Sequence, residues 1–253
     1  MIDPASLPES VNWFTSGYVT KPYDQGSCGG CWAFATASSL ESLAYIKGVF
    51  SELPEFSVQQ LLDCDHVNYG CDGGWMMDGY EYVRENGIEL KNAYTNKYSK
   101  KKLKCKHKKE RNVFLNTSAV EEDEISNDRL KALVSLQPIA VAMYSSSMLQ
   151  HYEHGVMTEK YLSCSNIKNE VNHAVVIVGY GKVAEGEKIY GSHQTCEEYW
   201  VVRNSWGHGW GEDGFFRLCM DHSDKTKQGI CQVNYYTQRP TFDPTPAPTP
   251  ELE

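Results

Sequence analysis

The sequence predicts an α+β protein whose helices lie mainly in the first half of the chain and whose strands lie mainly in the second. Two observations carry this prediction. Helical signals dominate before residue 118, and four segments after Pro138 are rich in β-branched and aromatic residues. Helices followed by strands, rather than alternating with them, indicate segregated regions. We expect a mainly helical half over 1–118, a β-rich half over 119–240 and a separate tail over 241–253.

Each predicted helix has its own boundary signal. Gly48 and Gly87 are C-terminal stops, and the Ser57-Val-Gln-Gln pattern is a capping box. Asn127 can cap the last helix, which the Gln-Pro dipeptide at Pro138 brings to an end. The predicted helices cover residues 31–47, 58–63, 75–86 and 128–136.

The predicted strands follow Pro138. They cover residues 139–144, 174–180, 199–204 and 214–218. Their β-branched and aromatic residues suit the pleated, half-buried surface of a sheet. We expect the last two strands to be antiparallel neighbours.

Charge and cysteine content narrow the class of protein. The 253 residues carry a net charge of −9, which is a poor match to a protein that binds nucleic acid or an anionic membrane. No apolar run approaches the roughly 18 to 20 residues of a membrane span. Nine cysteines are typical of a secreted, lysosomal or vacuolar protein with disulfides, and the odd number leaves one thiol over.

The two ends of the chain differ from its middle. The start shows no signal-peptide pattern, so we expect a mature form that was cut from a longer precursor. Residues 241–250 alternate largely between Thr and Pro, which favours extended polyproline II and excludes a packed core. This tail is either a frayed end or a stalk that leads to an anchor or another module.

Two charge blocks lie on either side of residue 118. Residues 97–111 are strongly basic and residues 121–124 are acidic. Such a block is either a solvated loop or the footprint of a glycan or partner. Between them, Asn116 begins a glycosylation sequon, which has meaning only in a secretory protein.

Three separated segments carry residues suited to nucleophilic acyl transfer. Cys31 begins a helix, where free backbone N–H groups and the helix dipole stabilise a thiolate. His173 begins an apolar strand, and Asn204 begins the segment Asn-Ser-Trp-Gly. A cysteine with a histidine, an orienting asparagine and an oxyanion donor is the set that this chemistry needs.

These motifs, in this order and with this spacing, resemble those of the papain-like cysteine proteases, the family of the cathepsins. The resemblance runs from about residue 7 to residue 240 and is strongest in QGSCGGCWAF, residues 25–34. This segment departs from the usual pattern at Gly30, where Ser or Ala is usual. The resemblance implies a papain-like two-domain fold. Its active-site cleft would lie between a mainly helical half and an antiparallel, β-barrel-like half.

The resemblance also implies roles for five residues. Cys31 corresponds to the nucleophile and His173 to the general base and acid. Asn204 corresponds to the residue that accepts a hydrogen bond from the other imidazole nitrogen. Gln25 corresponds to the side-chain oxyanion donor, alongside the backbone N–H of Cys31, and Trp206 to the indole that covers the Asn–His hydrogen bond.

Further residues correspond to the substrate cleft. Gly73 and Gly74 lie in a loop that would hold an extended peptide by β-type hydrogen bonds. The implied S2 pocket draws on Trp75, Met76, Ala142, Val171, Asn172 and Tyr236, and Trp206 lies beside the cleft. Because these residues are mostly apolar, we expect an apolar or aromatic P2 residue. Tyr236 either shortens the base of S2 or rotates out and packs in the core.

The family pattern implies three disulfides, which pair Cys28 with Cys71, Cys64 with Cys105, and Cys164 with Cys231. Three cysteines remain. If Cys31 is the free nucleophile, Cys196 and Cys219 are available for a fourth bridge. Both lie just outside the far ends of two predicted antiparallel strands, where they could meet.

The function implied by the resemblance is that of a cysteine endopeptidase that forms a thioester acyl-enzyme. No segment resembles the His-bearing occluding loop of exopeptidases. One alternative is a papain-like protein with a mainly adhesive or binding role. Another is a thiol oxidoreductase built on Cys28-Gly-Gly-Cys31, although the βαβ unit typical of that motif is not predicted.

The resemblance implies protein and peptide substrates, an inhibitory propeptide of its own and cystatin-like inhibitors. We expect a monomer that is lysosomal, vacuolar or secreted, or held at the cell surface by an anchor beyond the tail. No metal or organic cofactor is implied, because the Cys and His residues do not show zinc-ligand spacing.

Overall fold

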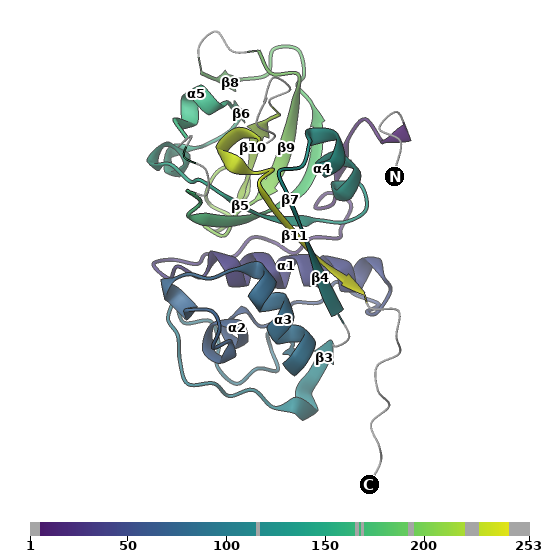
Figure 1. Ribbon diagram of the computed structural model, residues 1–253, viewed down its shortest axis with the longest axis vertical. Coiled ribbons are helices and arrows are strands. Elements are labelled where there is room, and N and C mark those ends of the chain that lie inside the picture. The colour runs from purple at the N-terminus through teal and green to yellow at the C-terminus, as the bar shows by residue number, and fades with distance from the viewer. Residues whose placement is uncertain are drawn as a thin grey trace.

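The computed structural model describes residues 6–114, 117–164, 167, 170–191, 195–220 and 228–242. Figure 1 shows two bodies along the longest axis, with α1, α2 and α3 in the lower one and most strands in the upper one. The sequon residue Asn116 and residues 243–253 of the predicted tail lie outside the described residues. In the part of the chain that is described, no helix is both long and apolar enough to cross a membrane.

Three helices form the lower body. They are α1 (Cys31–Ile46), α2 (Val58–Cys64) and α3 (Met76–Asn86). The Ser57 side chain accepts a hydrogen bond from the backbone N–H of Gln60, which confirms the predicted cap of α2. Gly87 ends α3 as predicted, whereas Trp75 is the extended residue that precedes α3 rather than its first helical residue.

The remaining helices are short. They are α4 (Asn127–Val134), α5 (Glu159–Leu162) and the 3₁₀ turns η2 (Gly70–Asp72), η3 (Lys109–Arg111), η4 (Ser147–His151) and η5 (Ile230–Gln232). The prediction that Asn127 caps the fourth helix is wrong by one residue. Ser126 has the extended backbone of a cap, and its side chain accepts the N–H of Arg129.

Nine of the described strands form one sheet. In the order of the sheet they are β4 (Thr117–Asp123), β11 (Tyr236–Phe242), β5 (Ile139–Met143), β7 (His173–Lys182), β9 (Glu198–Arg203), β10 (Phe215–Cys219), β6 (Val156–Met157) and β8 (Ile189–Tyr190), with β1 (Val11–Asn12) paired to β7. The described strands do not close into a barrel, and the β10–β6 and β6–β8 pairs are parallel. A separate ribbon joins β2 (Ile88–Glu89) and β3 (Asn112–Phe114).

Strands near both ends of the chain connect the two halves. Val11 of β1 pairs with Tyr180 of β7, so a segment near the start of the chain belongs to the sheet. β4 pairs with β11 and also packs on α3 of the lower body. The predicted boundary at residue 118 falls within β4, and the division of the chain at that point stays a prediction.

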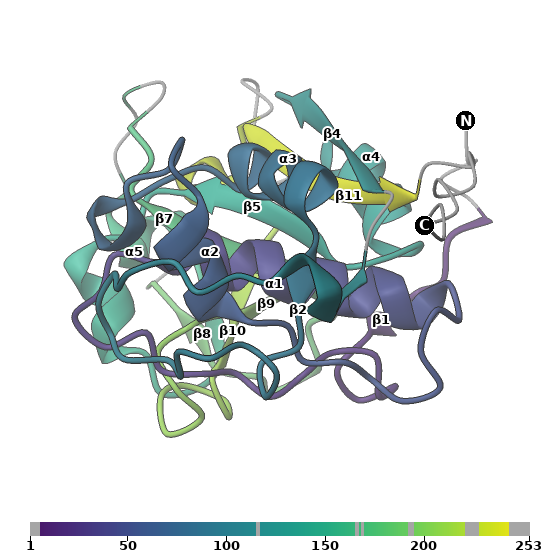
Figure 2. The same cartoon turned by 90° about the horizontal axis from the view of Figure 1, so that it is seen from below.

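Small residues bring α1 against the sheet. The core around α1 includes Ala140 and Ala142 of β5 and Ala174 of β7, all buried. Alanine leaves room for the helix to approach the strands closely, as Figure 2 shows for α1 beneath β5 and β7. This approach brings the first residue of α1 towards the first residue of β7, which are Cys31 and His173.

Candidate active site

Cys31 is the free thiol of the chain. The other eight cysteines form four disulfides, and Cys31 is the first residue of α1, partly open to solvent. Its sulfur therefore lies at the positive end of a helix dipole, next to backbone N–H groups without partners within the helix. Both features favour a thiolate.

His173 and Asn204 form a buried hydrogen bond. His173 Nε2 lies 2.8 Å from Asn204 Oδ1, and the two residues are 7% and 1% exposed. Because an amide oxygen can only accept, Nε2 carries the proton, which leaves Nδ1 for the hydrogen bond with Cys31. Asn204 Oδ1 also accepts the backbone N–H of Ser205 at 2.8 Å, which fixes the amide.

The charges of Cys31 and His173 are coupled. Burial raises the pKa of Cys31, but the hydrogen bond and positive charge of His173, with backbone N–H groups of Ala174 and Trp32, outweigh burial and hold that pKa below its ordinary value. Burial lowers the pKa of His173, but its bond to Cys31, the thiolate charge and Asn204 outweigh burial and raise that pKa. Both shifts favour a thiolate beside an imidazolium.

Trp206 covers the histidine. Its ring stacks on that of His173, with centroids 5.1 Å apart and planes at 29°. Trp210 packs edge-on against Trp206 at 4.9 Å. The two indoles form an aromatic wall on this side of the His173 ring.

The Gln25 amide is held from both ends. Its Nε2 donates to the carbonyl of Cys28 at 2.9 Å, and its Oε1 accepts the hydroxyl of Ser205. Its backbone N–H donates to the carbonyl of Ser205 at 2.7 Å. Because an amide nitrogen has two hydrogens, one Nε2–H remains for a ligand in the cleft that Gln25 lines.

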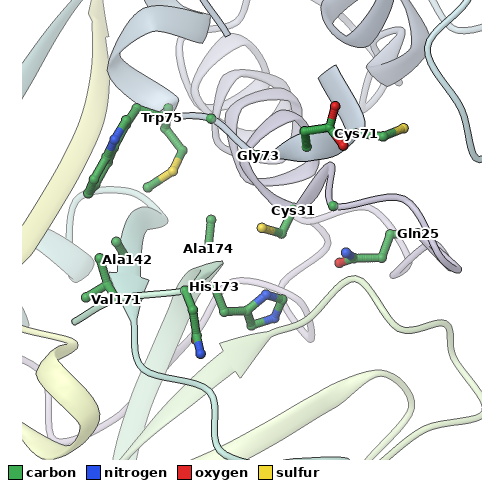
Figure 3. Close-up of a pocket in the computed structure, with 14 residues that line it drawn as sticks. Gln25, Cys31, Cys71, Gly73, Trp75, Ala142, Val171, His173 and Ala174 are labelled. Carbon is green, nitrogen blue, oxygen red and sulfur yellow. The ribbon is translucent and has the colours of Figure 1, made fainter. Parts of the chain in front are cut away.

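A cleft of about 420 Å³ opens above Cys31 (Figure 3). Ten of its lining residues are catalytic or substrate-binding residues predicted from the sequence: Gln25, Cys31, Gly73, Gly74, Trp75, Met76, Ala142, Val171, Asn172 and His173. The other lining residues are Gly29, Cys71, Asp72 and Ala174. Trp206 and Tyr236 are not among the residues that line it.

Tyr236 lies next to two residues of the cleft, Trp75 and Ala142. It is the first residue of β11, opposite Ala142 in the sheet register, and its ring packs edge-on against Trp75 at 5.1 Å. It also contacts Tyr235 at 4.4 Å. Tyr236 therefore contacts Trp75, a cleft residue that is 39% exposed.

Asn68 shapes the glycine loop and is not among the residues predicted from sequence. Its Oδ1 accepts the N–H of Trp75 at 2.7 Å, and its Nδ2 donates to Asp65 Oδ2 at 2.7 Å. A Cβ atom on Gly74 would lie 2.2 Å from Asn68 Oδ1, so only glycine fits there. Ser205 and Asn68 act through bonds that no local motif predicts, although Ser205 lies directly after Asn204.

The four disulfides are Cys28–Cys71, Cys64–Cys105, Cys164–Cys231 and Cys196–Cys219, the pairs expected above. Cys28–Cys71 joins the loop before α1 to the 3₁₀ turn η2, which directly precedes Gly73. Because Cys28 is bonded to Cys71, it cannot form a redox dithiol with Cys31. This pairing argues against a thiol oxidoreductase.

Comparison with known proteins identifies the family. The profile of the papain family cysteine proteases matches residues 7–239. The chain belongs to the papain family of cysteine proteases. Among papain-family relatives, ananain from Ananas comosus is 37% identical over 247 residues, 97% of this chain and 65% of the relative. Procathepsin L from Rattus norvegicus is 35% identical over 222 residues, 86% and 62% of the two chains. The chain thus spans slightly less than two thirds of these relatives.

Solved papain-family structures confirm the predicted fold. A bromelain protease from Ananas comosus, in complex with the E64 inhibitor, has a TM-score of 0.76 at 33% identity and covers 94% of this chain and 100% of its own. The proform of the ragweed pollen allergen Amb a 11 has a TM-score of 0.77 at 34% identity and covers 94% of this chain and 66% of its own.

Proposed function

We propose that this chain is a cysteine endopeptidase. The observation that carries the proposal is the position of the free Cys31 thiol, which is hydrogen-bonded to His173 at the floor of an open cleft. The Cys31 thiolate attacks a peptide carbonyl carbon, and His173 gives its proton to the departing amine. His173 then takes a proton from water, which attacks the thioester and releases the acid.

The negative charge that develops on the carbonyl oxygen needs donors. The backbone N–H of Cys31 and the second Nε2–H of Gln25 are the groups available for this role. Asn204 holds the imidazole in the tautomer that the proton transfers require, and Trp206 keeps water off that hydrogen bond.

An extended peptide would lie along Gly73 and Gly74 with its P2 side chain among Trp75, Met76, Ala142, Val171 and Asn172. The mostly apolar set favours an apolar or aromatic P2 residue. We place Tyr236 in S2 specificity through its contact with Trp75. We also propose that the protein is a monomer and that its own propeptide and cystatin-like proteins inhibit it. Its proposed location is lysosomal, vacuolar or secreted. The four disulfides support an oxidising compartment.

Peptidase turnover on a fluorogenic peptide library tests the proposal. The wild-type chain should cleave internal peptide bonds with apolar P2 residues, and Cys31→Ser should abolish cleavage while it stays folded. Tyr236→Ala should widen the P2 preference, and Tyr236→Phe should preserve it because the ring contact with Trp75 remains. Absence of turnover in the reduced wild-type chain would overturn the proposed activity, and an unchanged P2 profile in Tyr236→Ala would remove Tyr236 from specificity.

A further inference from the structure

The basic segment 97–111 plays no part in the proposed reaction. It contains eight lysines, one arginine and one glutamate, in a chain whose net charge is −9. From Lys102 to Lys108 the exposure alternates residue by residue, with Lys102, Lys104, Lys106 and Lys108 exposed and the residues between them half-buried. This alternation is typical of an extended chain, whose successive side chains point to opposite faces. The four lysines, here called the lysine row, therefore share one face.

The backbone beneath the lysine row is fixed to the lower body. Figure 2 shows this part of the chain as a long coil that passes α2. Cys105, between two of the lysines, is bonded to Cys64 of α2. Backbone N–H groups donate to buried side chains, from Leu103 to Asp63 at 2.6 Å, from Lys106 to Tyr94 at 3.0 Å and from Lys108 to Glu89 at 2.9 Å. The row is thus displayed on an ordered backbone, which lowers the entropy lost when a ligand binds.

The charges of the lysine row are not neutralised within the chain. Among the described residues, none of the four ammonium groups has an ion-pair partner, whereas neighbouring Lys100 pairs with Asp24 at 2.8 Å. An extended chain advances about 6.6 Å for every two residues, so four charges follow one another over about 20 Å. The row therefore presents a narrow, linear and uncompensated positive charge.

We propose that the lysine row binds a linear sulfated polysaccharide. Lysine ammonium groups are compact, strongly hydrated point charges that respond to charge density, whereas bidentate recognition of single phosphates or carboxylates favours arginine. The row has no arginine. A sulfated polysaccharide is a linear chain of dense, fixed negative charge. The disulfides are also consistent with a compartment outside the reducing cytosol.

Two other polyanions fit the row less well. Single-stranded nucleic acids bind to grooves in which bases stack on aromatic rings, and the segment of the lysine row, residues 102–108, contains no Phe, Tyr or Trp. An acidic peptide carries at most about one charge per residue on a flexible backbone and loses more conformational entropy on ordering. The row therefore favours the stiffer, more densely charged chain.

Binding of size-defined heparin to the full chain tests this proposal. The matched double variants Lys104→Gln/Lys106→Gln and Lys47→Gln/Lys160→Gln remove the same charge, and the second pair lies on exposed sites outside the basic segment. The row variant should weaken heparin binding about tenfold and lower the slope of log Kd against log salt by about two, while the control retains wild-type binding. Thermal unfolding and peptidase rate should be unchanged in both variants, so binding is measured separately from the proposed activity.

Three outcomes would overturn the proposal. Wild-type protein that does not bind heparin at physiological salt would exclude the ligand. Equal losses in the row and control variants would show that net charge, rather than the row, governs binding. Equally tight binding of poly-glutamate or oligo-dT of the same charge would assign the row to a different class of polyanion.

Discussion

Cys31 and His173 each stabilise the charged form of the other. Both are buried enough that burial alone would favour the neutral forms, which raises the pKa of the thiol and lowers the pKa of the imidazole. Their mutual hydrogen bond and attraction reverse both shifts. The nucleophile is therefore a property of the pair, and removing one partner should return the other to its neutral form.

The pH dependence of iodoacetamide alkylation tests this coupling. Wild-type Cys31 should react at lower pH than an ordinary thiol, because its pKa is lowered. In His173→Ala the burial remains while the counter-charge is lost, so the pKa should rise to at least the ordinary value of about 8.5 and the rate near pH 6 should fall at least tenfold. The modified residue is mapped by mass spectrometry, and superimposable pH profiles would contradict the coupling.

The loss of Gln25 should affect catalysis without affecting the stability of the fold. Gln25→Ala should lower kcat by about 10²–10³, because one oxyanion donor is lost, with little change in thermal unfolding. Ser205→Ala keeps the amide but frees its Oε1 end, so we expect a smaller loss of about tenfold. Steady-state kinetics on one peptide substrate measure both variants. An unchanged kcat in Gln25→Ala would remove Gln25 from the oxyanion role.

At the scale of the helix, the one departure from the family motif is Gly30. It is the N-terminal cap of α1, and a Cβ atom on it would lie 2.9 Å from Leu62 Cδ2 and 3.2 Å from Cys28 Sγ. Leu62 of α2 is fully buried. Glycine at this position therefore leaves room for Leu62 of α2 beside the start of α1.

Gly30→Ala should therefore destabilise the protein by about 1–3 kcal/mol, the usual cost of overpacking a core. Gly209→Ala is a matched control, because a Cβ atom on Gly209 meets no other heavy atom within 4 Å. Urea unfolding monitored by fluorescence measures both variants. Adding Leu62→Ala to Gly30→Ala should cost less than the sum of the single changes, and strict additivity would show that the Leu62 contact is not the cause.

At the scale of the whole molecule, a buried polar link joins the two halves beside the cleft. Glu41 of α1 accepts hydrogen bonds from Thr20 Oγ1 and from the backbone N–H of Phe56, both at 2.7 Å. Arg203, the last residue of β9 before Asn204, donates to the Thr20 carbonyl at 3.1 Å. Burial raises the pKa of Glu41 to about 7, although the charge of Arg203 opposes this rise.

This raised pKa fixes the sign of a pH effect on stability. A carboxyl whose folded pKa exceeds its unfolded value of 4.5 stabilises the fold below that value, and the stabilisation is lost as pH rises towards 7. The loss is on the order of 3 kcal/mol. Glu41→Gln, which mimics the protonated form, should flatten the stability profile between about pH 5 and pH 8. Urea unfolding across that range checks it, and an equal fall in both proteins would contradict the assignment.

Local signals explain how much of the fold was predictable. The four main helices lie within two residues of their predicted ends at most positions, because the Ser57 cap and the Gly87 stop act within one turn. β4 and β11 are absent from the predicted strands. β4 carries charged residues at Glu121 and Glu122, and its strand conformation comes from pairing with β11, far away in the sequence.

The sequence by itself determined the family, the α+β class and the identity of the residues that meet at the cleft. These follow from the order of the motifs and from the conformational preferences of neighbouring residues. Only the tertiary structure decided which side chains support them. Ser205 holds Gln25 across 180 residues, and Tyr236 packs against Trp75. Likewise, the extended backbone of the lysine row is held by hydrogen bonds to Asp63, Tyr94 and Glu89. Such contacts arise from packing between distant segments, whose pairing is set by the whole core rather than by neighbouring residues.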